Sequence, residues 1–208
     1  MFCTWLAAHG TSCLEFAAAS IGLIGVFLAI PESVWNWPTG IVNVALYAYL
    51  FVKQGYYANA GLQVVYLVLS IYGWYEWLHG GRARTELHVS RASRRVWFWA
   101  TAIGVATFVI LFTITRRIPG GAFTFTDAAT VAASLVAEWM LAKKFLDNWA
   151  LWIVVDAVYV PMFIAGHNYL TAINYLGYFV LAVMGFVAWK RSLDADRVAA
   201  SAAPATAA

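Results

Sequence analysis

The chain carries an internal repeat, and this feature restricts its possible folds more than any other. When the sequence is shifted by 112 positions, residues 36–77 align with residues 148–189 without a gap, and fourteen of the forty-two positions are identical. A hydrophobic chain that contains one module twice is typical of carriers whose site lies between two repeats. Five of the identical pairs are Trp or Tyr, which chance similarity between apolar segments rarely produces. The identical pairs are Asn36/Asn148, Trp37/Trp149, Ile41/Ile153, Val42/Val154, Ala45/Ala157, Tyr47/Tyr159, Phe51/Phe163, Tyr57/Tyr169, Ala60/Ala172, Tyr66/Tyr178, Val68/Val180, Leu69/Leu181, Gly73/Gly185 and Trp77/Trp189.

The composition places the repeat in a membrane. Hydrophobic residues make up 63% of the chain and charged residues 11%, whereas about 25% of the residues of a soluble domain are charged. A helix needs about 20 mostly apolar residues to cross the hydrocarbon core. The sequence therefore predicts an all-α membrane protein with seven transmembrane helices, at roughly 14–30, 34–52, 58–78, 95–114, 126–143, 148–165 and 169–189.

The span count fixes how the repeats are related. Span four, from Val96 to Ile114, has no counterpart in the repeat. Three spans leave the chain on the opposite side of the membrane and a fourth returns it, so both repeats enter the membrane in the same direction. This predicts two parallel three-helix repeats in a 3+1+3 order. The expected organisation is residues 1–79 for the first repeat, 80–125 for a cytoplasmic linker and linker helix, 126–191 for the second repeat and 192–208 for a disordered tail.

Basic residues predict the orientation. If successive loops alternate sides, one side carries ten Lys and Arg residues and the other only Lys53, Arg116 and Arg117. The positive-inside rule then places the N-terminus outside and the C-terminus in the cytoplasm. The basic residues form no continuous stripe, so the net charge of +3 gives no indication of nucleic-acid binding. The ten are Arg82, Arg84, Arg91, Arg94, Arg95, Lys143, Lys144, Lys190, Arg191 and Arg197.

The N-terminal segment leaves one question open. Cys3 and Cys13 both lie before or at the start of the first span, on the predicted outer side. A disulfide forms there if the compartment is oxidising, although two cysteines near a frayed terminus are more often unpaired. Residues 1–13 contain no Lys or Arg, so no cleavable secretion signal is expected.

Polar side chains within the spans are the candidate site residues, because each must find a partner or water inside lipid. Asp156 follows Trp149 by seven residues and Trp152 by four, and helical spacing places these three on one face together with Tyr159. Asn174 and Tyr178, four residues apart, share a face in the same way. The other candidates are Asn43, Gln63, Tyr66 and Glu138.

Two such faces turned toward each other would form a pocket walled by aromatic rings and containing an acid. Aromatic faces attract a flat cation and a carboxylate neutralises it, while amides both donate and accept hydrogen bonds, as a sugar diol requires. Structural roles compete with this interpretation. Asn43 and Gln63 also suit interhelical hydrogen bonds, and Glu138 also suits an ion pair with Lys143 or Lys144. Interfacial belt positions are expected for Trp35, Trp74, Tyr75, Trp77 and Trp189.

Several segments resemble the bacterial nicotinamide riboside transporters of the PnuC family. The resemblance extends from about residue 15 to 191. It rests on the run WNWPTGIVN from Trp35 to Asn43 and the run AGLQVVY from Ala60 to Tyr66. The remaining segments are IYGWYEW at 71–77, Thr126 with Asp127, NWALW at 148–152 and YLTA at 169–172.

The resemblance implies a 3+1+3 fold related to the sugar-transporting SWEET proteins. It implies facilitated diffusion of nicotinamide riboside across the bacterial inner membrane, with phosphorylation by a cytoplasmic kinase trapping the imported molecule. Substrate contacts would map to Trp149, Trp152, Asn174 and Tyr178. Glu138 departs from the family pattern, in which Gln is common at this position. Thiamine, also a flat cation, is therefore the alternative substrate.

Other functional classes find less support in the sequence. There is no G-x-x-x-x-G-K-[ST] phosphate loop, so the chain is not expected to drive transport with its own nucleotide hydrolysis. No zinc-type His spacing, G-x-S-x-G motif or nucleophile beside a base lies in a span, so neither an enzyme nor a bound metal or other cofactor is expected. Proton coupling through Asp156 or Glu138, a sensor role and assembly as a homo-oligomer stay open.

Overall fold

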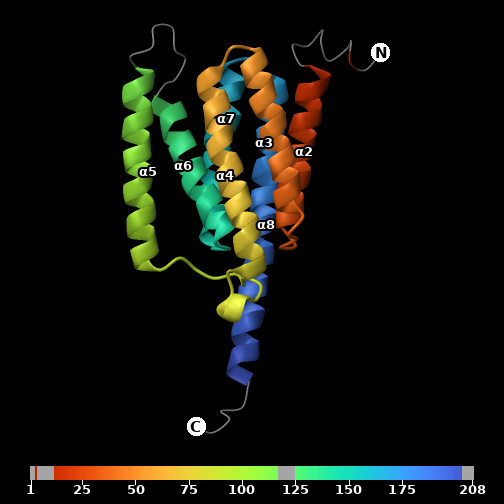
Figure 1. The fold of residues 1–208 in the computed structure, drawn as a ribbon, viewed down its shortest axis with the longest axis vertical. Helices are drawn as coiled ribbons and strands as arrows, with labels where there is room; N and C mark the ends of the chain where they lie inside the picture. Colours follow the sequence, from red (N-terminus) through yellow and green to blue (C-terminus); the bar gives the residue numbers. More distant parts are fainter. Residues whose placement is uncertain (1–2, 4–11, 117–124, 203–208) are drawn as a thin grey trace.

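The structure, a computed structural model, describes residues 3, 12–116 and 125–202 and confirms the all-helical fold class (Figure 1). Seven long helices agree with the seven predicted spans to within a few residues, apart from the last, which is longer. A short 3-10 helix, η1 (Arg82–Arg84), lies in the linker. The long helices are α2 (Cys13–Ala29), α3 (Asn36–Lys53), α4 (Tyr57–His79), α5 (Arg94–Thr115), α6 (Phe125–Ala142), α7 (Asp147–Ala165) and α8 (Tyr169–Ala202).

The helices run alternately up and down (Figure 1). We call one end of the bundle the linker end; it holds the turns at 30–35 and 143–146, the connection at 80–93 and the C-terminal part of α8. By length and composition alone, α5, α7 and α8 each contain a stretch that could cross a membrane, and α2 is apolar but shorter. Large apolar side chains such as Val68, Phe98 and Ile173 point outward, as contact with lipid requires.

Two three-helix units form the body of the bundle: repeat one is α2, α3 and α4, and repeat two is α6, α7 and α8. Repeat one meets repeat two where α4 packs against α6 and where α2 packs against α8. Helix α5 lies outside both units and packs on α6 (Figure 1). These two contacts between the repeats position the candidate substrate site.

Equivalent turns show how closely the repeats correspond. The turn after α2 contains Glu32 with a φ of 58°, and the turn after α6 contains Lys144, 112 positions later, with a φ of 50°. Non-glycine residues rarely adopt this left-handed conformation. At the other end, Gly55 and His167 stand in the same relation, with φ values of 78° and 57°. The duplication seen in the sequence therefore extends to the conformation of individual residues.

The C-terminal part of the chain differs from the prediction, and the N-terminal part contains the disulfide that the sequence left open. Helix α8 continues to Ala202, so the prediction of a disordered tail is wrong for residues 192–202, whose Ala-rich sequence favours a helix. Residues 203–208 lie outside the described residues. Cys3 and Cys13 form a disulfide, with their Cα atoms 5.3 Å apart. Ser12 begins α2 with a capping box, in which its side chain accepts a hydrogen bond from the Glu15 N–H at 3.1 Å.

Candidate substrate site

Four tryptophans close the linker end of the bundle, and we call them the tryptophan seal: Trp37, Trp77, Trp149 and Trp189. Trp37 and Trp77 of repeat one meet edge to face with centroids 5.4 Å apart, and Trp149 and Trp189 of repeat two do the same at 5.4 Å. Trp77 and Trp189 join the two pairs at 5.8 Å. The belt positions predicted for Trp77 and Trp189 are wrong, because both rings are buried in the core.

A glycine makes room for two rings of the seal, Trp37 and Trp149. A Cβ atom added at Gly185 would lie 2.5 Å from the Trp149 ring, and one added at Gly73 would collide with Trp37. Only glycine allows the helix backbone to approach an indole this closely. The repeated glycines of the sequence therefore set the packing of the repeated tryptophans.

Trp77 and Trp189 also form hydrogen bonds between the repeats. Trp77 of repeat one donates its Nε1–H to the carbonyl of Leu141 in repeat two, at 3.0 Å. Trp189 of repeat two donates to the carbonyl of Ala29 in repeat one, also at 3.0 Å. Ala29 and Leu141 are themselves 112 positions apart. These reciprocal bonds show a two-fold relation between the repeats at this end.

An ion pair lies beside the seal. Lys144 Nζ is 3.0 Å from Glu32 Oε2 and also lies over the Trp77 ring, 4.5 Å from its centroid. Because Glu32 and Lys144 are equivalent positions that meet, their contact lies on the two-fold axis. Lys143 pairs with Glu76 at 3.0 Å. The predicted alternative of a Glu138 pair with either lysine is thus not seen, since both lysines have other partners.

The linker holds the same end together. Ser90 donates its N–H to the Lys144 carbonyl at 3.0 Å and accepts from the Leu146 N–H at 2.8 Å. Asp147 accepts a hydrogen bond from the Ala92 N–H at 2.8 Å. Val89 is buried against the seal residues. The linker end is therefore closed by rings, by an ion pair and by the connection between the repeats.

Deeper in the bundle, four tyrosines gather between the repeats, and we call them the tyrosine cluster: Tyr66, Tyr159, Tyr175 and Tyr178. Tyr159 and Tyr175 have centroids 4.6 Å apart, and Tyr175 and Tyr178 are separated by 5.9 Å. Phe163 stacks on Tyr175 at 5.2 Å. Tyr66 interacts electrostatically with Tyr159 and Tyr175. The cluster thus joins α4 of repeat one to α7 and α8 of repeat two.

Two hydroxyls of the tyrosine cluster reach from one repeat into the other. Tyr66 of α4 has its hydroxyl beside Ser134 of α6. Its equivalent, Tyr178 of α8, places its hydroxyl on Gly22 of α2, where any added Cβ would collide with it. Gly22 and Ser134 are equivalent positions in turn. The tyrosine cluster therefore repeats the reciprocal pattern of the seal at mid-depth.

Two carboxyl groups adjoin the tyrosine cluster. Asp156, near the middle of α7, is 3% exposed and interacts electrostatically with Tyr159, Tyr175 and Tyr178. Glu138 of α6 interacts in the same way with Tyr66. Asp156 follows Trp149 by seven residues, so it lies about 10 Å farther from the linker end. Acids at this depth are retained where they are paired or used.

The structure brings most of the predicted site residues together. Asn174 lies beside Tyr178, one turn earlier on α8, and Gln63 is half-buried on α4, one turn before Tyr66. Asn43 donates to the Ala18 carbonyl at 2.7 Å and so ties α3 to α2. Trp152 packs against the seal. Trp149 lies within the seal, and its contact with substrate stays a prediction.

Four residues of the site were not identified from the sequence: Tyr47, Thr130, Ser134 and Tyr175. Tyr159 lies beside Thr130, and Tyr47 interacts electrostatically with Tyr178. Thr130 and Ser134 donate their hydroxyls to the carbonyls of Thr126 and Thr130, at 2.9 and 2.8 Å. The signal available was their spacing, since Thr130, Ser134 and Glu138 recur every four residues along one face of α6.

This arrangement defines a class of protein: an all-helical membrane carrier, built from two parallel three-helix repeats that enclose a polar, ring-lined cluster at mid-depth. Residues 12–191 match the profile of the family described as "Nicotinamide mononucleotide transporter". The chain belongs to this family, as the resemblance in its motifs predicted. It is a multi-pass membrane transporter and not an enzyme.

Known proteins similar to the chain extend over most of its length. The nicotinamide riboside transporter PnuC of Escherichia coli K12 is 25% identical over 209 residues, covering 88% of this chain and 87% of the relative. The riboflavin/roseoflavin transporter RibM of Streptomyces davaonensis is 29% identical over 197 residues, covering 89% and 88%. The crystal structure of the vitamin B3 transporter PnuC matches the fold with a TM-score of 0.70 at 23% identity, over 92% of this chain and 86% of that one.

Proposed function

We propose that the chain imports nicotinamide riboside across a bacterial inner membrane by facilitated diffusion. The observation that carries the proposal is Asp156, a buried carboxyl group beside a cluster of tyrosine rings at the contact between the repeats. The similarity to relatives named as nicotinamide riboside transporters supports it. In a cell the imported nucleoside would be trapped when a cytoplasmic kinase phosphorylates it.

The chemistry of the site suits this substrate. The pyridinium ring is flat and positively charged, so the faces of Tyr159 and Tyr175 attract it and the Asp156 carboxylate balances its charge. The amides of Asn174 and Gln63 can donate to and accept from the ribose hydroxyls. Trp149 stays in the proposal through its Nε1–H, which is buried and has no hydrogen-bond acceptor within the described residues.

Transport would proceed by alternating access, with repeat one rocking against repeat two. The reciprocal contacts of the seal and of the tyrosine cluster lie where such a motion must break and remake bonds. With the N-terminus outside, the linker end faces the cytoplasm, and the tryptophan seal is the closed cytoplasmic gate. Opening this gate would release substrate toward the kinase without a coupled energy source.

A second candidate is a carrier of another vitamin, and the similarity to a riboflavin/roseoflavin transporter favours it. A flavin ring is flat but neutral, so it needs the tyrosine faces and not the carboxylate. Thiamine, which is cationic, needs both. The charge of the preferred ligand therefore separates riboflavin from the two cations, nicotinamide riboside and thiamine.

Calorimetry on the purified chain with nicotinamide riboside, thiamine and riboflavin tests the substrate. We expect the tightest binding for nicotinamide riboside, and preference for riboflavin or for thiamine would replace the first proposal by the second. Uptake of labelled nicotinamide riboside into proteoliposomes tests the mechanism. Uptake should stop at equal concentrations inside and out. Accumulation beyond this level that a protonophore abolishes would establish proton coupling instead, and binding without any flux would indicate a sensor.

A further inference from the structure

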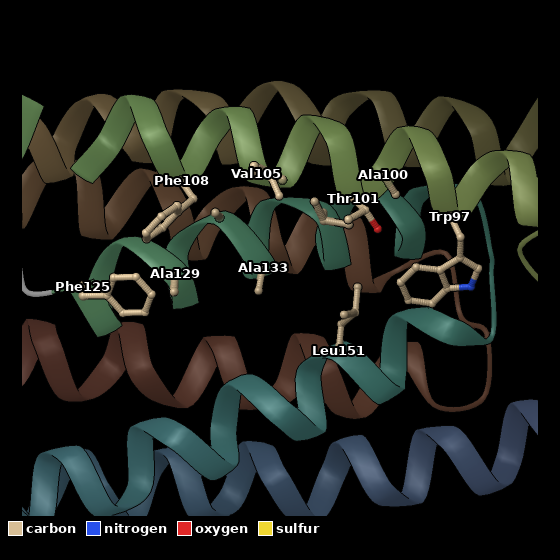
Figure 2. A pocket seen from close by; sticks show the side chains of 12 residues that line it. Trp97, Ala100, Thr101, Val105, Phe108, Phe125, Ala129, Ala133 and Leu151 are labelled. Carbon is tan, nitrogen blue, oxygen red and sulfur yellow. The ribbon is translucent and has the colours of Figure 1, made fainter. Parts of the chain in front are cut away.

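An apolar groove of about 280 Å³ runs along the outer face of the bundle between α5 and α6 (Figure 2). Leu151 of α7 forms part of its floor, and small residues such as Ala129 and Ala133 line its α6 side. It is separate from the tyrosine cluster and from the seal, whose residues do not line it. No feature of the proposed transport mechanism uses it.

Helix α5 is the least covered of the three helices that are long and apolar enough to cross a membrane. In the most apolar stretch of α5, 6% of the residues are buried, against 22% in that of α7. It approaches α6 at Gly104, where an added Cβ would lie 3.3 Å from Val136. At membrane depth the open side of the groove faces hydrocarbon, so its natural occupant is an acyl chain. The two ends of the groove then decide what kind of lipid it takes.

One end of the groove is apolar and lined by phenyl rings. Phe125 of α6 meets Phe108 edge to face at 4.9 Å and Phe112 at 6.1 Å, both on α5. Phe108 and Phe125 lie together at this end in Figure 2, with Trp97 at the other. An acyl chain that enters from the Trp97 end would thus stop at phenyl rings.

The other end of the groove is basic. Arg94 precedes Trp97 by three residues and Thr101 by seven, so it continues the α5 face that lines the groove. Arg91 and Arg95 flank it, and all three are exposed. Within the described part of the chain no acid forms an ion pair with them, and the neighbouring carboxylate of Asp147 accepts from the Ala92 N–H. An arginine side chain often binds a phosphate group through two parallel N–H···O hydrogen bonds.

We propose that the groove between α5 and α6 is a binding site for an anionic phospholipid. One acyl chain lies along the groove from Trp97 to Phe125, and Arg94 with Arg95 holds the phosphate and the negative headgroup. Trp97 sits at the polar–apolar boundary, where indole rings are enriched in membrane proteins. The charge of the open end matches an anionic lipid better than a zwitterionic one. The proposal requires only that the chain spans a membrane, whichever vitamin it carries.

Native mass spectrometry of the full chain tests the site. The protein is released from micelles that contain equal amounts of dioleoyl phosphatidylglycerol and dioleoyl phosphatidylcholine. We expect one retained lipid, with phosphatidylglycerol strongly preferred. The double variant Arg94→Gln and Arg95→Gln should reduce this preference by about fivefold for each arginine removed. Arg116→Gln, at the opposite end of the same helix, is the matched control and should leave the preference unchanged.

Filling the groove tests the place of the acyl chain. Ala133→Leu should reduce retention of both lipids, and Ala129→Leu serves the same purpose if the first variant does not fold, as judged by its thermal unfolding. Equal retention of the two lipids by the native chain overturns the proposal. So does an equal loss of preference in Arg116→Gln. A protein dimer that disappears on filling the groove would assign the groove to a second copy of the chain and would also overturn it.

Discussion

Repeat one and repeat two hold the same packing residues, but they differ in their polar groups. Each contributes two rings and a glycine to the seal, and each sends a tyrosine hydroxyl across to the other. Around the tyrosine cluster, however, polar residues of repeat two stand where repeat one has small or apolar ones. These pairs are Thr130/Ala18, Ser134/Gly22, Glu138/Val26 and Asp156/Val44.

This difference separates what moves from what binds. Symmetric packing gives two halves that can rock against each other with similar contacts. A substrate such as a nucleoside is itself asymmetric, with a charged ring at one end and hydroxyls at the other, so its recognition does not require both repeats to carry the same polar groups. Asp156 has no acidic counterpart in repeat one, whereas Tyr159 has Tyr47. The packing residues therefore keep the repeat, and the hydroxyls and acids of α6 and α7 depart from it. The following predictions test this division, from the largest expected effect to the smallest.

Removing Trp77 or Trp189 should reduce the stability of the chain by the same amount. Trp189→Ala and Trp77→Ala each delete a buried indole and its hydrogen bond to the other repeat, and each should lower the free energy of unfolding by about 3–5 kcal/mol. Chemical denaturation in detergent measures the effect. If one variant loses less than about 1 kcal/mol, the packing of the two repeats is not equivalent.

Changing the charge on the axis should be reversible by exchange. Glu32→Lys places a second lysine against Lys144 and should destabilise the chain by about 3 kcal/mol. The double variant Glu32→Lys and Lys144→Glu restores opposite charges at the same place and should recover most of the loss. Failure of the exchange to recover stability would show that the pair depends on its surroundings in each repeat and not on the axis.

Of the equivalent positions 156 and 44, only Asp156 in repeat two should contribute to substrate affinity. Asp156→Asn keeps the shape of the side chain but removes its charge, and it should weaken binding of nicotinamide riboside roughly 10- to 100-fold, as expected for a hydrogen bond to a charged group. Its counterpart Val44→Ala should change affinity by less than about twofold. Calorimetry measures both variants. An unchanged affinity in Asp156→Asn removes the acid from the site.

Removing the crossing hydroxyls should have the smallest effect. Tyr66→Phe and Tyr178→Phe each remove a hydroxyl that lies against the other repeat, beside Ser134 and Gly22 respectively. Hydrogen bonds between membrane helices contribute about 0.6 kcal/mol on average, so each variant should remain folded with a small loss of stability. A loss above about 2 kcal/mol in either one would make the tyrosine cluster a main source of stability.

Helix positions were predictable from the sequence because hydrophobic length and the 112-residue shift give the same boundaries. The position of Trp77 and Trp189 was not, since a tryptophan near a span end looks the same whether it faces lipid headgroups or the core. Their repetition at the 112-residue offset, together with that of Trp37 and Trp149, was the signal that they pack inside.

The candidate site was predictable in part. Asp156 and Asn174 are conspicuous in apolar spans, and the structure places both beside the tyrosine cluster. Thr130 and Ser134 are not conspicuous, because small hydroxyls commonly bond to the carbonyl of the preceding turn, as they do here. Tyr175 could not be singled out among eleven tyrosines without knowing which face of α8 turns inward.

The contact of Glu32 with Lys144 has a consequence for the origin of the molecule. At a two-fold axis each position meets its own copy, so two separate chains of repeat one would bring glutamate against glutamate, and two of repeat two would bring lysine against lysine. Like charges at this distance repel. Present-day halves, expressed alone, are therefore poorly suited to assemble as homodimers, and the opposite charges could arise only after duplication had made the partners unequal.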